Sequence, residues 1–150
     1  MSHVVSSKGL ITDLDCLEAV LAKHFPRMKL IRNQKTYKWY GQWVKDYHGS
    51  DAAYKNGIDP KSFGKCEHAI KLEGCGYEIG LVKVEGKDGY TAIWDFWGEG
   101  RKLSDAMGTG AERLMVAYGQ EFCQRFAESV GSTASTEIDN NEELLVEIDV

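Results

Sequence analysis

Apolar and polar residues recur with clear periods along much of this chain, and the periods predict its elements. Between residues 13 and 24 the apolar positions recur every three or four residues, which is typical of a helix with one buried face. Thr12 is placed to cap the first turn, and Pro26 ends the helix. A first strand, over residues 2–11, precedes this helix.

A second helix is predicted over residues 109–130. Thr109 and Glu112 form a capping-box pattern, and Gly131 is suited to the C-terminal cap. Apolar residues at a spacing of four predict a buried stripe along this helix. They are Leu114, Tyr118, Phe122, Phe126 and Val130.

The middle of the chain has the alternation of a sheet. Glycine-containing turns divide residues 66–72, 77–84 and 90–97 into three short runs, which predicts an antiparallel meander. With strands over 28–40 and 142–150, the order is β-α-β-β-β-β-α-β. We therefore expect an α+β fold, with a mostly antiparallel sheet and two helices on one face, either ferredoxin-like or a related sandwich.

Length and composition favour one soluble globular domain over residues 1–150. Apolar residues make up 43% and charged residues 27%, and the mean hydropathy is −0.38, which excludes a disordered or membrane-embedded chain. Two segments break the pattern, an inserted loop at 42–65 and a short polar linker at 132–140. Four scattered cysteines, with no leader-like apolar stretch, favour a reducing, cytoplasmic compartment.

Charge is distributed unevenly. The net charge is −5, yet residues 27–65 carry nine Lys and Arg against three Asp, whereas residues 132–150 carry six acids and no base. Seven aromatic residues fall within 37–63, interleaved with the lysines.

Three interpretations of this aromatic and basic segment stay open. Tryptophan, tyrosine and arginine dominate protein interfaces, which favours a non-enzymatic adaptor that binds a partner protein. Rings and cations also suit a nucleotide or a single-stranded nucleic acid, although the acidic C-terminal segment would repel long polyanions. The third interpretation is that half of these rings belong to the core and that the lysines form a solvated face. The residues assigned to partner binding are Tyr37, Lys38, Trp39, Tyr40, Trp43, Lys45 and Tyr47.

Other candidates for chemistry are isolated. Asp95 lies among Trp94, Phe96 and Trp97, where burial would raise its pKa, and a small enzyme built around Asp95 and His68 is a further alternative. A small anion site is possible at a helix start; its residues are Arg101, Lys102, Gly108 and Gly110. Cys66, His68 and Cys75 lack the second ligand pair of a zinc site, and no nucleophile or catalytic motif is evident, so we expect no metal or cofactor.

Several short motifs, taken in order, resemble a family of uncharacterised plastid and cyanobacterial reading frames, with relatives in other bacteria and in phages. These motifs are Met1-Ser2-His3, Asp13-Leu14-Asp15, Gly76-Tyr77-Glu78-Ile79-Gly80-Leu81, Trp94-Asp95 and Gln124-Arg125-Phe126-Ala127. The resemblance covers most of the chain but departs at 42–65 and at the cysteines Cys66 and Cys75. It implies one α+β domain in the cytoplasm or stroma and no established activity, and it supplies no catalytic residues.

Overall fold

The computed structural model describes residues 4–7, 9–39, 63–131, 133–138 and 144–149. Its elements follow in the order β1 (Val4–Ser6), α1 (Leu14–His24), β2 (Met28–Arg32), β3 (His68–Leu72), β4 (Glu78–Lys83), β5 (Tyr90–Asp95), α3 (Gly100–Met107), α4 (Glu112–Ser129), β6 (Thr133–Ile138) and β7 (Leu144–Asp149). The expected α+β class is confirmed. Because the order differs from β-α-β-β-α-β, the fold is a related sandwich rather than ferredoxin-like.

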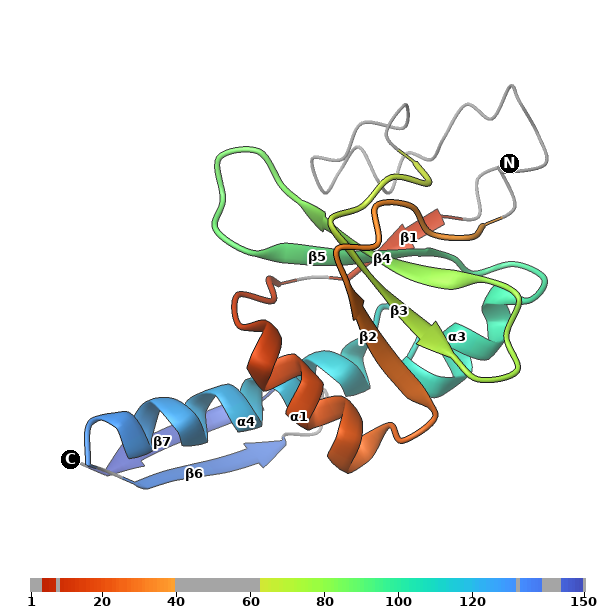
Figure 1. The fold of residues 1–150 in the computed structure, drawn as a ribbon. Helices are drawn as coiled ribbons and strands as arrows, with labels where there is room; N and C mark the ends of the chain where they lie inside the picture. The colour runs from red at the N-terminus through yellow and green to blue at the C-terminus, as the bar shows by residue number, and fades with distance from the viewer. Residues whose placement is uncertain (1–3, 8, 40–62, 132, 139–143, 150) are drawn as a thin grey trace.

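Five strands form one sheet in the order β1-β5-β4-β3-β2, and each neighbouring pair is antiparallel (Figure 1). The predicted meander is confirmed, since Ile70 of β3 lies opposite Ile79 of β4, and Leu81 of β4 lies opposite Ala92 of β5. β1 adds to the outer edge of β5 and β2 to the outer edge of β3, so the first two strands of the chain form opposite edges of this sheet.

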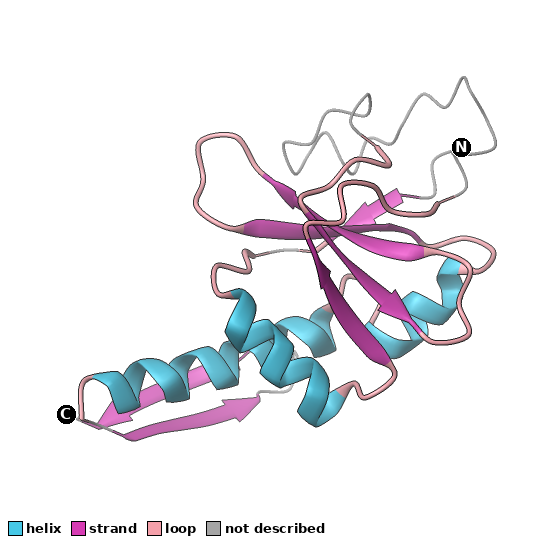
Figure 2. Ribbon diagram, in the orientation of Figure 1, coloured by secondary structure: helices cyan, strands magenta, loops and turns pink. Residues whose placement is uncertain are grey.

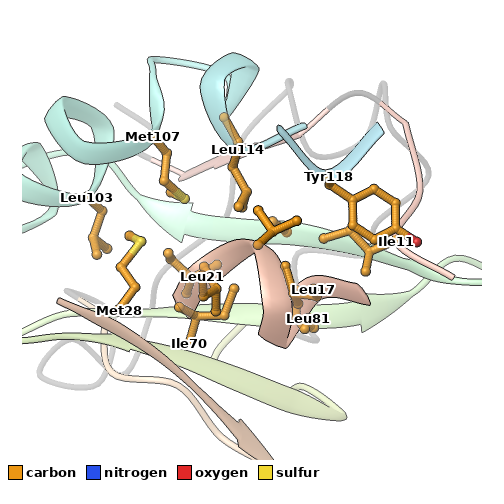
Figure 3. Close-up of a cluster of buried hydrophobic side chains, with 14 of the residues drawn as sticks. Ile11, Leu17, Leu21, Met28, Ile70, Leu81, Leu103, Met107, Leu114 and Tyr118 are labelled. Carbon is orange, nitrogen blue, oxygen red and sulfur yellow. The ribbon is translucent and has the colours of Figure 1, made fainter. Parts of the chain in front are cut away.

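The helices α1, α3 and α4 cover one face of the sheet (Figure 2). Alternate strand residues face them, as the period of two requires. Figure 3 shows these side chains meeting in one core, in which each fully buried aliphatic residue contributes about 1.5–3 kcal/mol. Its fully buried members include Leu17, Val20, Ile70, Ile79, Leu81, Trp94, Leu103 and Leu114.

Helix α3 was not predicted from the sequence. Only Leu103 and Met107 supply large buried side chains in its eight residues, which is too short a pattern to distinguish from a turn. Its position comes instead from tertiary contacts, because the indole Nε1 of the fully buried Trp94 donates to Ser104 Oγ at 3.1 Å.

A second, smaller cluster closes the other face of the sheet. Tyr37, Trp39 and Phe63 pack there against Ala69 and Ile93, which alternate with the residues that face the helices. The Trp39 and Phe63 rings meet edge to face at a centroid distance of 5.6 Å.

Gly80 allows this close packing. A Cβ atom at Gly80 would lie 2.4 Å from the Tyr37 ring, so the ring contacts the strand only because β4 has no side chain there.

The N-terminus of α1 differs from the expectation. Asp13, rather than Thr12, is the N-cap, and its Oδ1 accepts the Cys16 N–H at 3.0 Å. The backbone N–H groups of Thr12 and Asp13 both donate to the hydroxyl of Tyr118, at 2.9 and 3.0 Å. Tyr118 therefore ties α4 to the start of α1.

The capping box predicted for α4 is also wrong in detail. The helix begins at Glu112, because Ala111 has a left-handed backbone with φ 61° and keeps Thr109 outside the first turn. The Glu112 carboxylate accepts the Gly110 N–H at 2.9 Å and contacts the Thr109 hydroxyl at 3.5 Å. At the other end, Gly131 has φ 74° and ends the helix as predicted.

The buried stripe predicted along α4 covers only half of the helix. Leu114 and Tyr118 are buried, but Phe122 is 39% exposed, Phe126 51% and Val130 56%. Hydrogen bonds and ion pairs from α1 and the preceding loop reach α4 at Tyr118 and Glu121, and the helix continues beyond them. The distal part of α4 therefore extends past the main core.

The segment predicted as a linker at 132–140 contains a strand. β6 pairs with β7 in an antiparallel hairpin over six residue pairs, and the hairpin lies along α4 (Figure 1). Small polar residues such as Thr133 and Ser135 give no strand pattern in the sequence. The extended conformation of β6 depends instead on pairing with β7 and on contacts with α4.

Candidate binding surface

The aromatic rings of the 37–63 segment lie in the interior wherever the structure describes them. Tyr37, Trp39 and Phe63 are all buried and close the second face of the sheet. Tyr37 and Trp39 therefore do not offer rings to a partner, and the core interpretation holds for both. Lys38, between them, is exposed. Four other residues assigned to partner binding lie outside the described residues: Tyr40, Trp43, Lys45 and Tyr47.

Glu78 holds the start of this segment against the sheet. Its buried Oε1 accepts the Lys38 N–H at 3.0 Å and the Gln34 Nε2 at 3.1 Å, and its Oε2 lies 3.5 Å from Lys71 Nζ. A buried carboxylate that accepts backbone and side-chain donors is a structural group. Its position at the first residue of β4 gave no signal in the sequence.

Asp95 uses its carboxylate to shape the end of β5. It is fully buried, and its Oδ1 accepts the Trp97 N–H at 2.9 Å. The carbonyl of Asp95 contacts Gly100 so closely that a Cβ atom there would lie 1.5 Å away. The chain therefore turns sharply after β5 and enters α3 at once.

His68 does not meet Asp95. It lies on β3 opposite Leu81 of β4, so β4 separates its backbone from β5, and the ring reaches Tyr90 at the start of β5 rather than Asp95 at its end. Its Nδ1 accepts the Asn33 N–H at 2.9 Å, and its Nε2 lies 3.3 Å from the Tyr90 hydroxyl. Burial, with Lys35 nearby, lowers the pKa of His68, which favours the neutral ring that these contacts require.

Cys16, Cys66 and Cys75 are not activated, because burial raises the pKa of each thiol. Burial raises the pKa of both Cys16 and Cys66 to about 11, and the thiols of Cys66 and Cys75 contact the carbonyls of Gln34 and Glu99. A thiol with a raised pKa is a weak nucleophile and a weak metal ligand. Within the described ranges, no group of three or more His, Cys, Asp and Glu residues is arranged to hold a metal ion.

The residues of the predicted anion site are separated. Arg101 and Lys102 are neighbours on α3, and successive helical residues point about 100° apart, so they line different clefts on two sides of the helix. The Gly108 N–H donates to Ser104 O at 2.7 Å, and the Gly110 N–H donates to Glu112. Neither glycine presents a free backbone donor.

One of these clefts is lined by an exposed aromatic side chain, Phe96, and the next residue, Trp97, is exposed as well. Phe96 and Trp97 follow β5 directly, and 40% and 47% of their surfaces are exposed. We call Phe96, Trp97 and Arg101 the aromatic corner. The cleft beside it has a volume of about 610 Å³, and its lining comprises Val5, Phe96, Arg101, Ser104, Asp105 and Thr109.

The surrounding fold fixes the aromatic corner rigidly. The Asp95 carboxylate holds the Trp97 backbone, and the Trp94–Ser104 hydrogen bond holds α3 against β5. The apolar pattern predicts a strand over residues 90–97, whereas β5 ends at Asp95, so this surface was not predicted. The signal was the Gly98-Glu99-Gly100 sequence, which cannot continue a strand.

Arg101 brings an available charge to this corner. Among the described residues, no hydrogen bond or ion pair engages its side chain, whereas Arg32 pairs with Asp15 and Glu18. A guanidinium beside a cleft with exposed rings suits recognition of carboxylate or phosphate groups.

Comparison of the chain with protein-family models, with curated proteins and with solved structures gives no match. The resemblance to plastid and cyanobacterial reading frames therefore stays a prediction. In the part of the chain that the structure describes, no helix is long and apolar enough to cross a membrane.

Proposed function

We propose that this protein is a binding protein that docks a partner protein through the aromatic corner. The observation that carries the proposal is the pair of consecutive exposed aromatic side chains, Phe96 at 40% and Trp97 at 47%, of which Phe96 lines the same cleft as Arg101. Large exposed apolar side chains beside polar residues mark interaction sites, and Trp and Arg are the commonest anchors of protein interfaces.

A binding role also agrees with the contacts of the buried polar residues. Asp95, His68 and Glu78 each satisfy backbone or side-chain groups of neighbouring segments. Their hydrogen bonds support a structural role for each, so the small-enzyme alternative loses its two candidate residues. All four cysteines are free, which supports a reducing, cytoplasmic location.

The test is to capture a partner from the source cells with the tagged chain and then measure its affinity for purified variants. We expect Trp97→Ala and Arg101→Ala each to weaken binding by tenfold or more, because truncation of a hot-spot anchor costs about 2 kcal/mol. Phe126→Ala is the matched control, since Phe126 is equally exposed on the distal part of α4. Unchanged affinity of the two corner variants would contradict the proposal, provided that circular dichroism shows them folded.

A nucleotide is the second candidate, favoured by the cleft itself. Phe96 offers a ring, Arg101 a guanidinium, and Ser104 and Thr109 two hydroxyls within the same 610 Å³. Asp105 opposes it, because a carboxylate in the lining repels phosphate. Saturable quenching of tryptophan fluorescence by AMP or ATP, lost in Arg101→Gln and at high salt, would favour the nucleotide over the protein partner.

The prediction for Tyr40, Trp43, Lys45 and Tyr47 is tested against the same partner. Tyr40→Ala and Trp43→Ala, made separately from the corner variants, report whether this part of the 37–63 segment adds to the interface. Lys38→Ala tests the exposed cation that precedes them.

A further inference from the structure

We propose that the second cleft, which adjoins the first at Asp105 of α3, binds a small monocarboxylate with an apolar body, and that Arg27 holds its carboxylate. The cleft has a volume of about 630 Å³, within the usual range for small-molecule sites. It lies between the α1–β2 turn, the β3–β4 turn and α3. Its lining comprises Phe25, Pro26, Arg27, Met28, Leu72, Glu73, Gly74, Lys102, Asp105 and Ala106.

The interior of this cleft is apolar. Met28 and Leu72 are opposite one another at the ends of β2 and β3, and Met28 continues into the main core, as Figure 3 shows. Phe25 and Ala106 add partly buried side chains from the end of α1 and from α3. An aliphatic or aromatic body placed here would contact hydrocarbon on several sides.

Arg27 has unused hydrogen-bond donors at the same cleft. Its backbone is fixed because the Glu73 N–H donates to Arg27 O at 2.9 Å, and its Nη2 donates to the Glu73 carbonyl at 3.1 Å. That contact uses one of five guanidinium donors. Within the described part of the chain, no carboxylate lies within ion-pair distance of Arg27, in contrast to Arg32 and Arg125. A ligand carboxylate can therefore pair with its fork.

The other charges limit the ligand to a single negative charge. Lys102 donates to the Gly74 carbonyl at 3.1 Å, but its charge is already paired with Glu99 at 2.9 Å. Glu73 and Asp105 also line the cleft. Arg27 can pair with one ligand carboxylate, whereas each further negative charge of a polyphosphate would meet repulsion from Glu73 and Asp105.

The experiment compares three probes of one shape: 4-phenylbutyrate, 4-phenylbutanol and 4-phenylbutylamine. Two-dimensional NMR of the full isotope-labelled chain reads binding residue by residue. We expect only the acid to shift the amide signals of Met28, Leu72 and Ala106 saturably, with a Kd on the order of 1 mM for a ligand of this size. A second probe, N-acetyl-Gly-Phe, distinguishes the carboxyl end of a polypeptide from a small free acid, and its amide is the uncharged control. If N-acetyl-Gly-Phe binds more tightly than 4-phenylbutyrate, the natural ligand is a chain end.

Matched variants assign the charge. Arg27→Gln should weaken binding of 4-phenylbutyrate at least tenfold, and Arg27→Lys, which keeps the charge but loses the fork, should weaken it severalfold. Arg125→Gln is the control, because Arg125 is an exposed arginine on α4 that lines neither cleft. If Arg27→Gln does not fold, the affinity of Arg27→Lys for 4-phenylbutyrate tests the proposal by itself.

Three results would overturn the proposal: no saturable shifts at Met28, Leu72 and Ala106, equal binding of the alcohol and the acid, or equal loss in the Arg27 and Arg125 variants. The aromatic corner adjoins the other cleft. The effect of Trp97 variants on partner capture therefore tests the proposed function separately from ligand binding at Arg27.

Discussion

Single side chains connect segments that are far apart in this sequence, and Tyr118 shows how. Its hydroxyl accepts two backbone N–H groups, from Thr12 and Asp13, more than one hundred positions earlier. Tyr118→Phe keeps the ring in the core but leaves both donors without this acceptor. These two hydrogen bonds are only partly buried, so we expect a loss of about 1 kcal/mol in the free energy of unfolding.

Urea denaturation measures this loss. Thr12→Ala is the control, because Thr12 is exposed and its hydroxyl makes only a long contact of 3.3 Å with Tyr118. We expect the control to change stability by less than about 0.5 kcal/mol. Equal stability of Tyr118→Phe and the unchanged protein would show that water or a shifted backbone replaces the hydroxyl.

His68 makes stability depend on pH. Burial lowers its pKa in the folded state below the ordinary value of about 6.5, so the unfolded chain takes up a proton first as the pH falls. The stabilising contribution of the neutral ring is complete above pH 6.5 and is lost as the pH falls toward the folded-state pKa.

His68→Asn isolates this effect, because an amide oxygen can accept the Asn33 N–H without titrating in this range. The difference in unfolding free energy between the unchanged protein and His68→Asn should therefore shift against the unchanged protein as the pH falls from 7 to 5. If the unfolding free energies of the two proteins change in parallel with pH, the prediction for His68 is wrong.

Helix α4 behaves as two halves at the scale of elements. Leu114 is fully buried, whereas Phe126 is 51% exposed beyond the reach of α1. Leu114→Ala should therefore cost about 2–5 kcal/mol through a core cavity, and Phe126→Ala about 0.5 kcal/mol or less. Thermal and urea unfolding of the two variants provide the measurement, and equal losses would mean that another surface covers the distal half.

The strength of each local pattern decides which elements can be predicted. Helix α1 and the three strands of the meander follow from dense apolar periods such as Leu17, Val20 and Leu21. Helix α3 has two large buried residues and β6 has small polar ones, so their conformation depends on Trp94, Ser104 and the partner strand β7. The apolar stripe on α4 predicts the helix correctly. The spacing of apolar residues does not show how much of the helix the neighbouring elements cover.

The same limit explains the candidate sites. Residues 37–63 are rich in aromatic and basic residues, but the pattern of apolar and polar positions does not reveal that the Tyr37 ring packs over Gly80. The aromatic corner was hidden because Phe96 and Trp97 continue the apolar pattern of β5, and only the buried Asp95 carboxylate turns them outward. Neither cleft beside α3 has a sequence signal, since the lining comes from several elements.

On the scale of the whole molecule, the acidic hairpin and the aromatic corner are at opposite ends. β6 and β7 lie along α4, away from the β5–α3 turn (Figure 1). Residues 132–150 hold six acids and no base, so their removal changes the net charge without touching the corner.

A chain that ends at Gly131 separates these contributions. We expect it to keep the five-stranded sheet, with the near-ultraviolet signal of buried Trp94, and to lose about 1–2 kcal/mol as Ala127 and the hairpin-facing side of α4 become exposed. Its affinity for a partner docked at the aromatic corner should stay within about threefold at physiological salt, because screening acts over about 8 Å. Loss of the Trp94 signal would show that the hairpin is required for the fold. A steep change in affinity with the sheet intact would instead place the partner across both ends of the molecule.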